Sequence, residues 1–150
     1  LVGAGGSDVT VAMVNACAEA HPAFEWTALG VPGSPWTPDP WAAICTADVV
    51  VTHAGQNCIA DLAAAERPAV VIPQPRPFDE QRAMAGVLQR HRLAVTARGW
   101  PDLRAWPALL THARAGDPHR WRRWATRGAA ARAADAIETV ARRCARGGVV

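Results

Sequence analysis

The sequence contains no lysine, so all 16 of its basic residues are arginine. Together with the abundance of alanine, this indicates a bias in coding rather than a function. The net charge of +3 is modest and argues only weakly for a polyanionic partner. No stretch approaches the ~18 consecutive apolar residues of a membrane span. The N-terminus also has no basic region before an apolar one, so no signal peptide is predicted.

Cysteine is sparse as well, and its positions exclude two further classes of protein. The four cysteines are scattered, at Cys17, Cys45, Cys58 and Cys144. Their spacing matches neither a metal-binding motif nor a small disulfide framework. A reduced protein of the cytoplasm is the plain interpretation.

Half of the 150 residues are hydrophobic, which is enough to bury a core in one domain that spans residues 1–150. Strands are predicted at residues 1–2, 24–29, 48–52, 69–72 and 93–96. Helices are predicted at residues 8–20, 41–46, 56–66, 79–92, 101–115 and 119–146, with a proline-rich loop at 30–40. This alternation predicts an α/β protein with a Rossmann-like parallel sheet and helices on both faces.

Three polar clusters follow predicted strands, at residues 3–8, 53–61 and 73–81. Ligands of such sheets bind beyond the carboxyl ends of the strands, so we expect the clusters to meet at one edge. The first cluster begins after only two strand residues, although so glycine-rich a turn normally follows a full strand. We therefore expect the chain to begin inside a larger protein.

Each cluster has a ligand-binding and a structural interpretation, and both stay open. Residues 3–8 suit a phosphate cradle at a helix start, with Ser7 or Asp8 as N-cap, or a tight turn without a ligand. In the second cluster, His53 and Asn57 can donate to phosphate, and Asp61 can accept from two ribose hydroxyls. In the structural interpretation, His53 is a buried histidine whose hydrogen bonds are satisfied, Asn57 caps the helix and Asp61 is a solvated helix residue. The third cluster can grip sugar hydroxyls or simply cap a helix.

Taken together, these residues resemble a known motif. HAGQNCIAD is similar to the HxGxNSxxE core of the nucleotide-sugar motif in GT-B glycosyltransferases, and RPAVVIPQPRPFDEQ resembles its continuation. The nearest group is family 28, in which a GGS-type loop opens the C-terminal domain. The resemblance therefore implies the nucleotide-sugar-binding domain, in the C-terminal half of a GT-B fold.

The resemblance also implies roles for single residues. The glycine loop, the histidine and the first turn of the following helix would face the diphosphate. Asp61 would bind ribose, the acid and amide of the third cluster would hold the sugar, and the backbone of the proline-rich loop would contact the base. The implied donor-binding residues are Gly5, Gly6, Ser7, Trp36, Thr37, His53, Gly55, Asn57, Cys58, Asp61, Glu80 and Gln81. Three departures from the family pattern are Cys58 for serine, Asp61 for glutamate and Met84 for asparagine.

The implied function is binding of a nucleotide sugar, with UDP as the expected carrier, in an inverting hexosyl- or N-acetylhexosaminyltransferase. The resemblance implies neither a metal nor another cofactor. It places the general base in an N-terminal acceptor-binding domain, which we expect to be missing from these 150 residues. That domain or a separate subunit would be a partner, and this chain alone would be inactive.

Two rival functions and one surface remain to be weighed. A non-catalytic nucleotide-sugar sensor fits the departures at Cys58 and Asp61. A Rossmann-type oxidoreductase is disfavoured because Asp8 would repel a pyrophosphate and because no ribose-binding acid follows residues 24–29. The basic, aromatic segment 119–127 could make a peripheral membrane contact. The favoured alternative is that its tryptophans pack inward. Nucleic-acid binding is not expected.

Overall fold

The computed structural model describes residues 8–124 and 126–146. Its helices are α1 (Val11–Ala20), α2 (Trp41–Thr46), α3 (Gln56–Ala65), α4 (Glu80–Arg90), α5 (Trp106–Arg114) and α6 (Ala129–Arg146). Three short 3-10 helices are η1 (Pro77–Asp79), η2 (Leu103–Ala105) and η3 (Pro118–Trp124). The strands are β1 (Val50–Thr52), β2 (Ala69–Val71) and β3 (Val95–Thr96).

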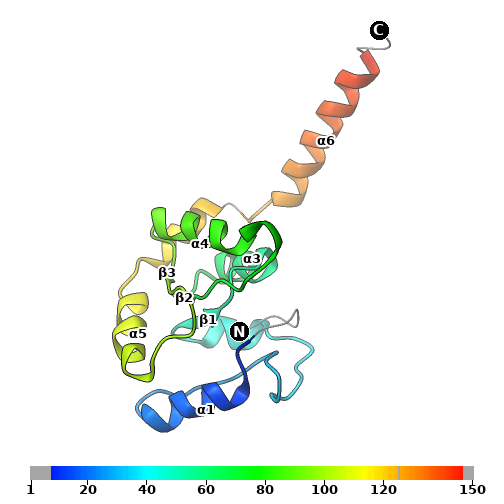
Figure 1. Cartoon of the computed structure of the whole chain (residues 1–150). Coiled ribbons are helices and arrows are strands. Elements are labelled where there is room, and N and C mark those ends of the chain that lie inside the picture. The colour runs from blue at the N-terminus through cyan, green and yellow to red at the C-terminus, as the bar shows by residue number, and fades with distance from the viewer. Residues whose placement is uncertain (1–7, 125, 147–150) are drawn as a thin grey trace.

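The described strands form one parallel sheet in the order β1-β2-β3. Val51 pairs with Val70, and Val70 pairs in turn with Val95. Successive side chains of a strand point to opposite faces, and both faces are covered here. Val71 packs in a core with α3 and α4, whereas Val70 packs in a second core with α5 (Figure 1). The predicted α/β, Rossmann-like fold is confirmed.

Two predicted elements differ from the structure near the N-terminus. The first helix begins at Val11 rather than at residue 8, because the side chain of Thr10 caps it by accepting from the Met13 N–H at 3.4 Å. Residues 24–29 pair with no described strand and form a partly extended connection instead. Trp26 packs edge-on against the ring of Trp106, at 5.3 Å between centroids. The predicted strand at residues 1–2 lies outside the described residues.

The predicted helix at 119–146 is divided into η3 and α6. Gly128, between them, has a φ of +69°, a left-handed conformation that favours glycine and ends a right-handed helix. The indole of Trp121 anchors η3 because its N–H donates to the Arg67 carbonyl at 2.8 Å. Beyond this point α6 extends away from the rest of the fold, and its residues 129–145 are all exposed (Figure 1).

Candidate functional site

A chain of hydrogen bonds joins three loops at the carboxyl edge of the sheet. The side-chain oxygen of Gln81 accepts from the backbone N–H of Ala54 at 3.2 Å and from that of Gln74 at 2.9 Å. The side-chain oxygen of Gln74 accepts in turn from the Asp8 N–H at 3.3 Å. Both glutamines are buried, with 3% and 8% of their surface exposed. The described parts of the three polar clusters, with Asp8 alone from the first, therefore lie together, as expected for segments that follow strands of one parallel sheet.

Gln81 has a structural task that its sequence position did not reveal. Two accepted bonds use both lone pairs of its carbonyl oxygen, so only the amide NH₂ group remains to contact a ligand. A sugar contact through that NH₂ group stays a prediction. The role of Gln74 was missed altogether, although it stands between two prolines directly after a buried strand.

His53 follows β1 and folds back over the start of α3. Its Nδ1 accepts from the Gly55 N–H at 2.9 Å, which leaves the proton of the neutral ring on Nε2. Nε2 lies 3.6 Å from the Cys58 sulfur. Burial and the nearby charge of Arg76 lower the pKa of His53 below 6.5. The imidazole is therefore neutral at pH 7, and Nε2 can donate a proton in a hydrogen bond but supplies no charge.

Gly55 is required by space rather than by its backbone angles, since its φ is −69°. A Cβ atom at this position would lie 2.8 Å from Nδ1 of His53 and closer still to the adjacent ring carbon. The close approach lets the ring accept the Gly55 N–H. The H-x-G part of the motif is thus one packed unit.

The N-terminus of α3 is open to an anion. Its N-cap, Gly55, offers no side-chain hydrogen bond, and Gln56 and Asn57 in the first turn are exposed. The unpaired N–H groups and the dipole of a helix start attract negative charge. Asp61 is half-buried one turn beyond Asn57 on the same face. These two side chains keep the relative positions that the sequence predicts.

The loop before α4 has a strained backbone. Phe78 and Asp79 both have left-handed angles, with φ of 61° and 52°, although neither is glycine. Asp79 pairs with Arg82 at 3.1 Å rather than capping the helix. Glu80 is exposed at the first position of α4, where it is available to a ligand.

The remaining predicted contacts belong to the proline-rich loop between α1 and α2 and to the glycine-rich segment before Asp8. Trp36 is 77% exposed in the proline-rich loop, and the Thr37 hydroxyl donates to the Asp39 carbonyl at 3.3 Å. The Val11 N–H donates to the Pro32 carbonyl at 3.1 Å, which holds this loop beside the start of α1. Gly5, Gly6 and Ser7 lie outside the described residues.

The described residues among the predicted donor-binding set lie apart from the two main cavities. A cavity of about 800 Å³ lies between residues 23–31 and β1, and another of about 540 Å³ lies beyond the end of α3. Of the predicted donor-binding residues that the structure describes, none lines either cavity. The described residues hold no cluster of three His, Cys, Asp or Glu side chains that could bind a metal ion.

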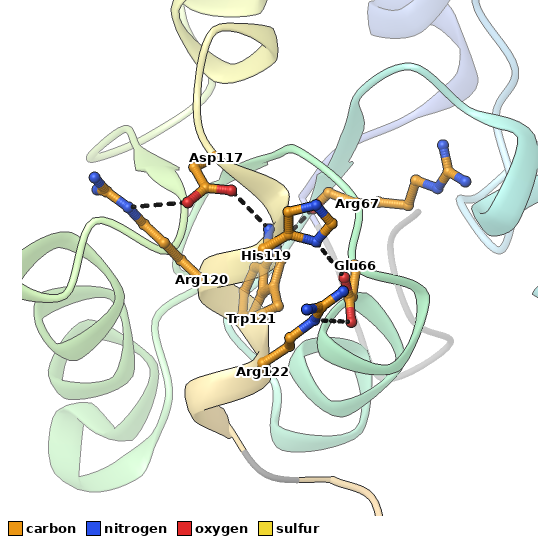
Figure 2. A network of polar contacts seen from close by, with 7 residues as sticks. All are labelled: Glu66, Arg67, Asp117, His119, Arg120, Trp121 and Arg122. Atoms are coloured by element: carbon orange, nitrogen blue, oxygen red, sulfur yellow. Dashed lines mark hydrogen bonds and ion pairs between the residues drawn. The ribbon is translucent and has the colours of Figure 1, made fainter.

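A second polar network lies around the C-terminal end of α3 and holds η3 against it (Figure 2). Glu66 accepts from His119 at 3.0 Å and from Arg122 at 3.1 Å. These hydrogen bonds lower the pKa of the Glu66 carboxyl. Trp121 is only 1% exposed, so the inward packing favoured from the sequence is confirmed. Among the described helices, each is too short or too polar to cross a bilayer.

Comparisons with known proteins agree with this architecture. The sequence profile of the glycosyltransferase family 28 C-terminal domain matches residues 18–98. A solved structure titled as the glycotransferase of kitacinnamycin is similar to 92% of this chain, with 26% sequence identity and a TM-score of 0.62. The chain spans only 42% of that protein's length. A search of curated proteins found no match.

Proposed function

Because the chain belongs to the glycosyltransferase family 28 C-terminal domains, we propose that it binds the UDP-sugar donor of an inverting hexosyl- or N-acetylhexosaminyltransferase. One observation carries the proposal. The hydrogen-bond chain from Asp8 through Gln74 and Gln81 to Ala54 brings the loops that follow β1 and β2 and the segment at Asp8 to one edge. Parallel sheets bind their ligands at that edge.

Different groups of the protein bind the diphosphate, the ribose, the sugar and the base of the donor. The diphosphate lies at the N-terminus of α3, where backbone N–H groups and the Nε2–H of His53 donate to its oxygens. Asp61 accepts from the ribose hydroxyls, and Glu80 accepts from the sugar. The loop that carries Trp36 contacts the base. No metal is needed in this arrangement, because the donors are groups of the protein.

Inversion requires that an acceptor hydroxyl attack the anomeric carbon from the face opposite the departing UDP. Negative charge then grows on the diphosphate, and the N–H groups at the start of α3 stabilise it. The general base belongs to an N-terminal acceptor-binding domain of the whole enzyme. Helix α6 supports such a partner, since Ile137 and Val140 on one of its faces are 69% and 59% exposed.

The test is calorimetric titration of the folded chain with UDP in the absence of metal, beside ADP, dTDP and NAD. We expect saturable binding that prefers UDP and that weakens about tenfold to a hundredfold in Asp61→Ala, since hydrogen bonds to a carboxylate are lost. Asp135→Ala is the matched control, because Asp135 is exposed on α6. A preference for NAD, or no binding of any nucleotide, would overturn the proposal.

A further inference from the structure

The strand-end edge is rich in carboxylates for a site that receives a diphosphate. Asp8, Asp61 and Glu80 all belong to the converging loops and to the helices that follow them. Asp79 is neutralised by Arg82 at 3.1 Å. Arg76 is the other guanidinium of these described loops. Whether these carboxylates are offset by a positive charge therefore depends on where the guanidinium of Arg76 lies.

The neutral donors of the site do not supply this charge. The Nδ1 atom of His53 accepts the Gly55 N–H, and burial and Arg76 lower the pKa of the ring. A neutral imidazole and the start of a helix offer partial charges only. A ligand with several negative charges near carboxylates calls for a full positive charge at short range.

The backbone at Arg76 is held by its neighbours. It stands between Pro75 and Pro77, whose rings restrict the backbone on both sides. Two residues before it, Gln74 shares the Gln81 oxygen with Ala54. Its own carbonyl accepts from the Asp79 N–H at 3.1 Å. Because Gln74 and Ala54 donate to the same oxygen, the backbone that carries the half-buried Arg76 lies beside the turn between β1 and α3. The effect of its charge on the pKa of His53 agrees with this placement.

We propose that Arg76 is a donor-binding residue whose guanidinium contacts the diphosphate at the start of α3. The inference rests on the proposed function and adds a cation that the sequence motif did not indicate. A planar guanidinium can donate two parallel hydrogen bonds to phosphate oxygens, which fixes the direction of the group as well as its charge. Partial burial strengthens the contact because water screens it less.

The test compares ligands that differ only in their phosphates. UDP and uridine are titrated into the isotopically labelled chain and followed by NMR, which measures weak as well as tight binding. The variants are Arg76→Gln, Arg76→Lys and the control Arg123→Gln on the exposed side of η3. Thermal unfolding of each variant is recorded alongside.

We expect Arg76→Gln to weaken UDP about tenfold to a hundredfold and to leave uridine unchanged, because a charged hydrogen bond is lost. Arg76→Lys retains the positive charge but cannot donate two parallel hydrogen bonds, so it should lose less UDP affinity than Arg76→Gln. UDP affinity should fall with salt more steeply in the wild type than in Arg76→Gln.

Two results would overturn the inference while leaving the proposed function intact. One is unchanged UDP binding in Arg76→Gln. The other is an equal loss for UDP and uridine, which would mean that Arg76 only shapes the loop. Failure of the wild type to bind either ligand would instead overturn the proposed function, and this inference with it.

Discussion

Replacing Gln81 with leucine tests whether one side chain holds the strand-end edge together. Leucine has nearly the same volume but no acceptor, so the N–H groups of Ala54 and Gln74 lose the oxygen they share. An unsatisfied buried donor costs about 1–3 kcal/mol. Two of them cost about 2–6 kcal/mol, a large part of the ~5–15 kcal/mol that stabilises a typical domain.

The assay is urea unfolding of the wild type and of matched variants. Gln81→Glu keeps an acceptor for both N–H groups and should lose less stability than Gln81→Leu. Gln89→Leu makes the same change at an exposed position of α4 and should alter stability by less than about 0.5 kcal/mol. If Gln81→Leu unfolds at the same urea concentration as Gln89→Leu, the shared oxygen does not hold the loops, and the reasoning fails.

Three further predictions follow from single contacts. Gly55→Ala displaces the His53 ring and should cost about 1–3 kcal/mol together with UDP affinity, measured by unfolding and titration; unchanged values would contradict the packed unit. Thr52→Val removes a buried hydroxyl that has no hydrogen-bond partner among the described residues, so the free energy of unfolding should rise by about 1 kcal/mol, and a fall would reveal a partner. The folded pKa of Glu66 is lowered, chiefly by His119, so its contribution is present above pH 4.5 and lost as the pH falls through the folded value. Glu66→Gln should therefore weaken the loss of stability in acid, which unfolding at several pH values measures.

Much of the fold could be predicted because its signals are local. The apolar run before His53 marks a strand buried on both faces, and α3 stops before Pro68 where the sequence predicts a stop. The parallel sheet covered on both faces followed from the alternation of strands and helices. The convergence of the polar clusters followed too, since the carboxyl ends of parallel strands share an edge.

The structural roles that the sequence did not reveal come from contacts between distant residues. The bond from Asp8 to Gln74 spans 66 positions, and the one from Ala54 to Gln81 spans 27. No local pattern encodes such a bond. The same holds for the Trp121 indole, whose anchor at Arg67 fixes η3 far from its own sequence neighbours. The sequence thus predicts which residues reach the edge but not which of them the fold itself uses.

That distinction changes how the motif should be interpreted. Gln81 and Gly55 fit their positions for structural reasons alone, since one is an acceptor for two loops and the other makes room for a ring. Their presence would be required even in a chain that had lost its ligand. The discriminating residues are those without such a duty, chiefly Asn57 and Glu80, which are exposed at the starts of α3 and α4. A polar side chain exposed at a helix start contributes little to folding, so a loss of nucleotide affinity without a loss of stability is the signature of a working site. Asp61→Ala tests the ribose contact in the same way, because Asp61 is only half-buried and forms no part of the hydrogen-bond chain through Gln74 and Gln81. It should weaken nucleotide binding without lowering stability.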